Sequence, residues 1–156
     1  MGEIHRIEDQ LNRAVRGGAW HGPSLLQILK GVSASQAAAR PVNGSHSIWE
    51  IVNHVTVWQT LVRGGLVGQK MPHLAASKDW PLVNKIDVKA WKNTLKQLEA
   101  SAETLRQALR ATSEDRLSAR VRGRRYSVYY MLHGIIQHDL YHAGQIALLK
   151  KAQSTC

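Results

Sequence analysis

The chain is poor in cysteine, because only Cys156 among its 156 residues carries a thiol. A single cysteine can form no disulfide within the chain, and no cluster of thiolates is available to hold a metal ion. Any metal site in this protein must therefore use nitrogen and oxygen ligands, which histidine and the acidic residues supply.

Long apolar segments are absent as well. No stretch approaches the roughly 18 apolar residues of a membrane-spanning helix, and the N-terminal segment MGEIHRIEDQ lacks the apolar centre of a signal peptide. We therefore expect no membrane partner and a location in the cytosol. The length and the 44% hydrophobic content fit one globular domain over residues 1–156, with one core.

Acidic residues are scarce relative to basic ones: 11 Asp and Glu stand against 21 Lys and Arg, a formal charge of +10. Such a charge can attract nucleic acids or anionic substrates. The densest basic run, Arg116–Arg125, contains no aromatic residues and lies between two helical patterns, so a solvated connecting loop is the preferred interpretation. A nucleic-acid partner therefore ranks last among the hypotheses.

Four segments show the three-four spacing of apolar residues that is typical of amphipathic helices. They cover approximately residues 3–16, 47–67, 87–111 and 127–152. A shorter helix is expected at residues 24–30, within the long connection that follows the first segment. We find no internal repeat, low-complexity tract or β-type alternation. The pattern predicts an all-α fold, an antiparallel four-helix bundle with a long connection between its first and second helices.

Residues at the predicted helix starts support these boundaries. Ser47 and Glu50 have the S-x-x-E spacing, in which each side chain satisfies a free backbone N–H of the other residue. Asp87 and Ser127 are of the types that cap the start of a helix.

Two histidines occupy core positions of the last predicted helix. Residues four apart lie on one helix face with Cβ atoms about 5–6 Å apart, so His138 and His142 can meet one ion at about 2.0–2.1 Å per bond. His54 lies on the inward stripe of the second helix and is the candidate third ligand. His133 lies about 140° around the helix from His138 and is left out.

The spacing alone leaves two interpretations open. The three histidines either bind a divalent metal or are core residues satisfied by ordinary hydrogen bonds. An ion would satisfy three ring nitrogens at once, which favours the metal mildly. The groups that could orient ligating imidazoles are Glu50, Asp139 and Gln145. Trp58 and Tyr141 are candidates for a substrate pocket, although aromatic residues at helical spacing more often lie in a core.

Two segments of the chain resemble the DinB/YfiT-like superfamily of metal-binding helical bundles: SIWEIVNHVTVWQ at residues 47–59 and HGIIQHDLYHAGQIALLKK at residues 133–151. The likeness includes the D-W-P stretch at residues 79–81 and the lead-in at 126–129. It implies an up-down-down-up bundle, often a homodimer. It also implies a divalent ion, commonly nickel or zinc and with manganese as a further choice, held at the positions of His54, His138 and His142.

The resemblance implies metal-dependent chemistry without selecting a reaction. Better-understood members use the metal to activate a low-molecular-weight thiol for group transfer, isomerisation or dehalogenation, and others are classed as hydrolases. Three histidines leave an ion with vacant positions that water or a thiol can fill. We therefore expect a metal-dependent enzyme, with thiol-dependent group transfer of the S-transferase type as first choice. The alternatives are a metal-dependent hydrolase and a metal-binding bundle without catalysis.

Overall fold

The computed structural model describes residues 2–154, so Cys156 lies outside the described residues. Within this range the regular elements are helices, together with one isolated bridge between Arg120 and Ser127. The all-α prediction is confirmed. None of the described helices has the length and apolar character needed to cross a membrane.

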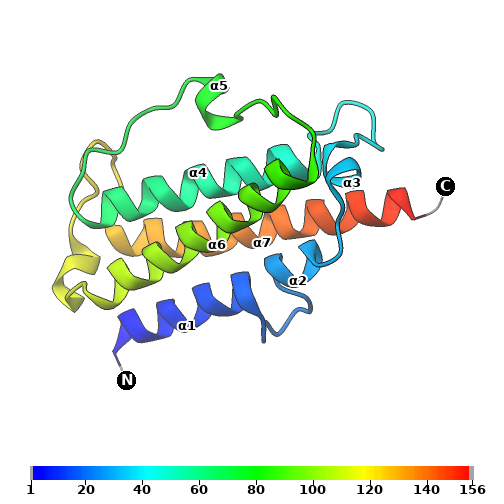
Figure 1. The fold of residues 1–156 in the computed structure, drawn as a ribbon. Helices are drawn as coiled ribbons and strands as arrows, with labels where there is room; N and C mark the ends of the chain where they lie inside the picture. The colour runs from blue at the N-terminus through cyan, green and yellow to red at the C-terminus, as the bar shows by residue number, and fades with distance from the viewer. Residues whose placement is uncertain (1, 155–156) are drawn as a thin grey trace.

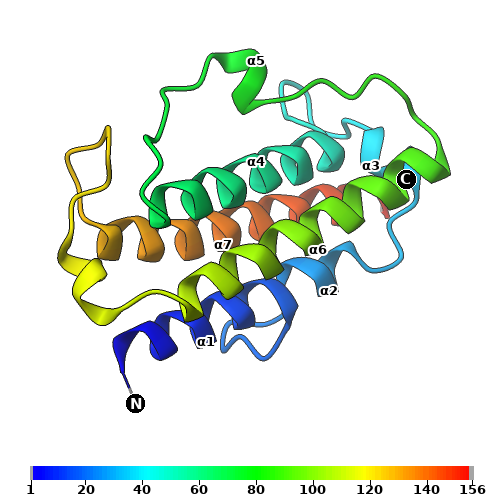
Figure 2. The same cartoon turned by 60° about the vertical axis from the view of Figure 1, so that its left-hand side comes forward.

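Four long helices lie side by side in both views of the fold (Figures 1 and 2). Helix α4 contacts α6 and α7, and α1 contacts the same two helices. Their bounds are Glu3–Arg16 for α1, Ile48–Leu66 for α4, Val88–Arg110 for α6 and Val128–Gln153 for α7. Each lies close to the bounds predicted from apolar periodicity.

The predicted caps begin three of these helices. Ser47 Oγ accepts a hydrogen bond from the Glu50 backbone N–H at 3.2 Å, while the Ser47 N–H donates to Glu50 Oε2 at 2.8 Å. Asp87 accepts from the Ala90 N–H, and Ser127 accepts from the Tyr130 N–H. Each cap satisfies a backbone donor that the helix itself leaves free.

Short elements occupy the connections. The predicted helix at 24–30 is α2, Leu25–Leu29. Three further elements were not predicted: α3 at Ala34–Ala38, α5 at Ala76–Asp79 and the 3₁₀ helix η1 at Glu114–Ser118. They are too short to show periodicity. The capping box of α3, formed by Ser33 and Gln36, is a signal in the sequence that could have revealed that helix.

The basic Arg116–Arg125 segment is only partly the solvated loop that was expected. Its apolar residues Leu117 and Val121 are buried in the core. Arg116 donates to the backbone carbonyls of Gly65 and Leu66 at 3.4 and 3.3 Å. The apolar side chains between the arginines enter the core and therefore fix this segment to the end of α4.

A polar layer divides the apolar core. One cluster of buried apolar residues includes Val62, Ala102 and Ile136, and the other includes Val55, Leu98 and Ala143. The buried residues Gln59, Ser101 and Asp139 lie between these positions on α4, α6 and α7 respectively. The polar groups of the three helices therefore meet at one level of the core.

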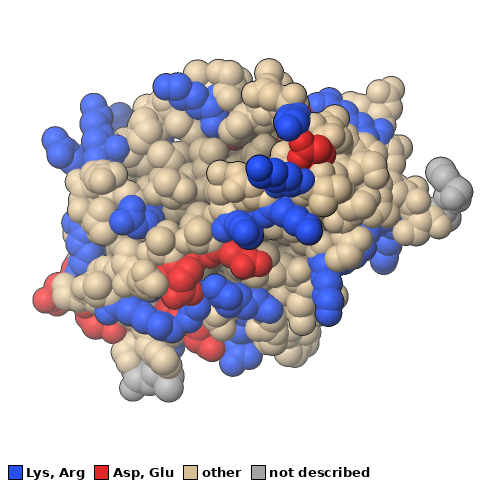
Figure 3. Space-filling model, in the orientation of Figure 1, with Lys and Arg blue, Asp and Glu red and all other residues tan. Residues whose placement is uncertain are grey.

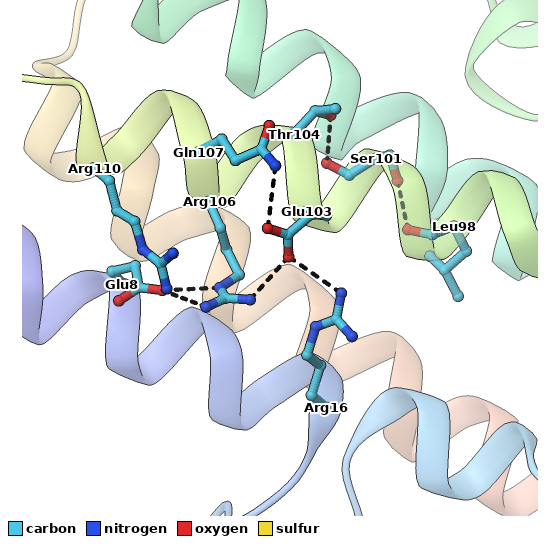
Figure 4. A network of polar contacts seen from close by, with 9 residues as sticks. All are labelled: Glu8, Arg16, Leu98, Ser101, Glu103, Thr104, Arg106, Gln107 and Arg110. Atoms are coloured by element: carbon cyan, nitrogen blue, oxygen red, sulfur yellow. Dashed lines mark hydrogen bonds and ion pairs between the residues drawn. The ribbon is translucent and has the colours of Figure 1, made fainter.

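Figure 3 shows lysine and arginine side chains spread over one face of the molecule, with acidic side chains between them. One acidic group between α1 and α6 is buried. Glu8 of α1 accepts hydrogen bonds from Arg106 at 2.7 and 2.9 Å and from Arg110 at 2.8 Å (Figure 4). Burial by itself raises the pKa of Glu8, but the hydrogen bonds and charges of the two arginines outweigh burial and lower it. This contact ties α1 to α6.

The substitution Glu8→Gln should destabilise the protein at neutral pH by about 1–3 kcal/mol, since it weakens hydrogen bonds to charged groups at a buried position. The folded-state pKa lies below the ordinary value of 4.5. The contribution of the carboxylate is therefore complete above about pH 4.5 and is lost as the pH falls through the folded pKa. Urea unfolding of both proteins should show a difference in stability that narrows below this pH.

The control is Asp9→Asn, which removes a surface ion pair with Arg13 on the same helix. This substitution should lower the free energy of unfolding by no more than about 0.5 kcal/mol. If Glu8→Gln and Asp9→Asn lower the free energy of unfolding by the same amount at every pH, the prediction is wrong.

Candidate metal centre

The three predicted histidines come together between α4 and α7. Each of His54, His138 and His142 offers one ring nitrogen, and these three atoms lie within 4.8 Å of one another. His54 and His142 are buried, while His138 is partly exposed. The Nε2 atoms of His54 and His138 are 3.0 Å apart. A single ion can therefore reach all three rings.

Hydrogen bonds orient two of the rings. His54 Nδ1 lies 2.8 Å from the backbone carbonyl oxygen of Asp79, and His142 Nδ1 lies 2.7 Å from Oε1 of Gln145. Both partners are acceptors, so both Nδ1 atoms carry the proton and both Nε2 atoms carry the lone pair. The lone pair is the ligand that a metal ion needs, and the outer hydrogen bond holds the ring in position.

The surroundings of His138 fit a cation at the centre. His138 Nδ1 and Asp139 Oδ1 are buried atoms without a hydrogen-bond partner, 3.6 Å apart. If His138 Nε2 donated its proton to His54, a lone pair on His138 Nδ1 would face the carboxylate. A cation that accepts the lone pairs of both Nε2 atoms would instead place the proton of His138 on Nδ1. The Nδ1–H group would then face the Asp139 carboxylate.

The nitrogen spacing agrees with this interpretation. At metal–nitrogen bonds of about 2.0–2.1 Å, two nitrogens on one ion lie about 2.9 Å apart at an octahedral angle and about 3.4 Å apart at a tetrahedral angle. The observed separation of 3.0 Å between the Nε2 atoms of His54 and His138 falls in this range. The donor set and the spacing of this pair therefore fit a divalent metal ion.

Burial keeps two of the imidazoles neutral. It lowers the pKa of His142 to about 4, with a further lowering by His138 and an opposing effect of the Gln145 hydrogen bond. Burial also lowers the pKa of His54, against the opposing hydrogen bond to Asp79. Both rings are therefore deprotonated at neutral pH, so an incoming metal ion displaces no proton from them.

Asp139 connects His138 to the polar layer of the core. Its side chain is fully buried, and burial raises the pKa of its carboxyl group. Gln59 Nε2 donates to Asp139 Oδ2 at 2.8 Å, and Ser101 Oγ donates to Gln59 Oε1 at 2.6 Å. This chain of contacts spans α7, α4 and α6, and it fixes the carboxylate beside His138.

Of the three groups predicted to orient a ligand, two lie beside the histidines and one does not. Asp139 lies next to His138, and Gln145 contacts His142. The carboxylate of Glu50 contacts Ser47, Arg40 and His46 instead of a member of the histidine set. Its position in the first turn of α4 directs the side chain back to the start of the helix, so Glu50 has a capping role.

No contact of Asp79 or Trp80 with the histidines was predicted from the sequence. Trp80 stacks on His54 with ring centroids 3.9 Å apart and on His46 with centroids 3.6 Å apart. Besides its carbonyl contact with His54, Asp79 accepts a hydrogen bond from Trp58 Nε1 at 2.8 Å. The D-W-P stretch was the only signal in the sequence for these contacts. A loop has no periodicity from which its position over a helix could be predicted.

The two predicted pocket residues lie next to different histidines. The Trp58 ring lies 5.8 Å from the His138 ring, centroid to centroid. The Tyr141 ring lies 5.2 Å from that of His142 and is largely exposed. Trp58 is thus part of the wall around the histidines, whereas Tyr141 lies at the outer edge.

Comparison with known protein families identifies the family of this chain. No curated protein and no solved structure matches the chain. The sequence model of the DinB superfamily matches residues 19–146, which include all three histidines and the loop that covers them. The match extends over most of the 156 residues. The chain therefore belongs to the DinB superfamily.

Proposed function

We propose that this protein binds one divalent metal ion through His54, His138 and His142 and uses the vacant positions of that ion to activate a small ligand. The observation that carries the proposal is the convergence of three ring nitrogens within 4.8 Å, two of them on rings held by outer hydrogen bonds. Nickel and zinc are the first ions to test and manganese the next, because imidazole nitrogen suits nickel and zinc.

A divalent ion here would supply Lewis acidity, which lowers the pKa of a water or thiol ligand towards neutrality. The protein's own residues prepare the site. Asp79 and Gln145 hold two rings in a ligating orientation, and the Trp80 ring covers His54 and limits the access of water. Three histidine ligands would leave a bound ion with vacant positions for such a ligand.

Thiol-dependent group transfer is the reaction that we propose to test first. The described residues contain no cysteine, so a thiol that reacts at this centre would come from a separate low-molecular-weight molecule. Membership of the DinB superfamily supports this choice. Metal-dependent hydrolysis, with water in place of the thiol, is the alternative, and metal binding without catalysis is the third.

We also infer that the four long helices form the up-down-down-up bundle implied by the family resemblance. The ribbon directions in Figure 1 support this arrangement, since α1 and α7 run one way and α4 and α6 run the other. In such a bundle, ligands from facing helices can converge on one core site, as His54 and His138 do from α4 and α7.

Replacement of a proposed ligand should abolish stoichiometric metal binding. After chelation and reloading, elemental analysis should find about one ion per wild-type chain and far less in His54→Ala and His142→Ala. Metal at 100 times its Kd should stabilise the wild type by about 2.7 kcal/mol, seen as a higher Tm. The control His133→Ala, on the same helix as His138 and His142, should retain the ion. If the wild-type protein retains no metal and its Tm does not rise when metal is added, the proposal is wrong.

The substitution Asp139→Asn should weaken metal binding by about 10–100-fold, because groups that orient ligating histidines have effects of this size. The replacement keeps the shape of the side chain and removes a buried charge, so the metal-free protein should be no less stable than the wild type. Titration calorimetry and metal-free urea unfolding separate the two effects. A loss of metal-free stability with unchanged metal affinity would show that Asp139 has only a structural role.

Metal-loaded protein should catalyse transfer of a thiol to an electrophile. The assay combines mycothiol, bacillithiol or glutathione with 1-chloro-2,4-dinitrobenzene, and it should show turnover that His54→Ala reduces to the uncatalysed rate. Hydrolysis of a p-nitrophenyl ester without thiol would favour the hydrolase. If the metal-bound protein shows no turnover in either assay, metal binding without catalysis is the hypothesis that remains.

A further inference from the structure

An apolar cavity lies beside the histidine centre, between α4 and α7. Its volume is about 180 Å³. Trp58 and Val62 of α4, Met71 of the following segment, and Tyr130, Gly134 and His138 of α7 are among the residues that line it. One of the three proposed metal ligands therefore forms part of the cavity wall.

The polar groups of the wall are largely engaged by other side chains. Trp58 Nε1 donates to Asp79 Oδ1 at 2.8 Å, and the hydroxyl of Tyr126 donates to Met71 Sδ at 3.6 Å. His138 directs Nε2 towards His54. The remaining surface consists mainly of aliphatic and aromatic carbon, so the wall suits a ligand group without polar atoms.

Gly134 keeps this space open. It lies inside α7, four residues before His138, and therefore on nearly the same helix face. A Cβ placed on Gly134 would meet no atom within 4 Å. Glycine weakens a helix interior, and no close packing at this position requires it. A longer side chain there would extend into the cavity.

We propose that this cavity binds an apolar group of the substrate, of the size of one six-membered ring or a short alkyl chain, while the reactive part of the same molecule reaches the metal ion. The size follows because an apolar protein cavity of about 150 Å³ accommodates benzene. The inference rests on the proposed function, since it assumes an ion at His138. It adds a substrate class, small electrophiles or thiols that carry one apolar group.

The test uses protein loaded with cobalt, whose absorption spectrum reports thiol binding, and the probes ethanethiol, propanethiol, butanethiol and benzyl mercaptan. Affinity should rise about fourfold for each methylene that the cavity buries. The variant Gly134→Leu should abolish this increase. The matched control Gly144→Leu replaces another glycine of α7 whose Cβ would meet no atom within 4 Å, but which does not line the cavity. It should retain the increase.

A second measurement separates this inference from the metal site. Toluene is titrated into metal-free, ¹⁵N-labelled wild-type protein and both leucine variants, and the amide shifts of α7 are followed by NMR. Saturable shifts around residue 134 in the wild type and in Gly144→Leu, but not in Gly134→Leu, would support the cavity even if no metal bound. Equal affinity for all four thiols, or toluene shifts unaffected by Gly134→Leu, would overturn the inference.

Discussion

The close approach of His54 and His138 is the contact on which the centre depends. Their Nε2 atoms are 3.0 Å apart, although the two residues are 84 positions apart in the sequence and belong to different helices. Two imidazole nitrogens at this distance need a shared proton or a shared cation. The hydrogen bond from His54 to Asp79 and the carboxylate beside His138 both favour the cation. The remaining features of the site arrange or protect this contact.

The polar layer explains how the core tolerates the centre. A buried carboxylate or amide is costly unless it has hydrogen-bond partners. Gln59 bonds to both Asp139 and Ser101, so one side chain of α4 satisfies groups on α7 and α6. Apolar clusters lie on either side of this layer. The packing that stabilises the helices therefore also positions the carboxylate next to His138.

The cover of the site comes from a loop. Trp80 lies against His54, and the Asp79 carbonyl fixes the same ring, so the segment around α5 closes one side of the centre. The cavity with Trp58 and Gly134 lies beside another ligand, His138. The centre thus combines fixed imidazoles, an aromatic cover and an adjoining apolar space, which together suit the binding of a small molecule next to an ion.

Apolar periodicity and caps in the sequence determined the four long helices, because helix formation at Ser47, Asp87 and Ser127 depends on neighbours within one turn. The four-residue spacing also determined that His138 and His142 share a face. Only the tertiary structure decided that Glu50 turns to Arg40, that Trp80 covers His54 and that Gln59 reaches Asp139. These contacts join residues from different elements, whose relative placement follows from packing of the whole core and leaves no periodic signal in the chain.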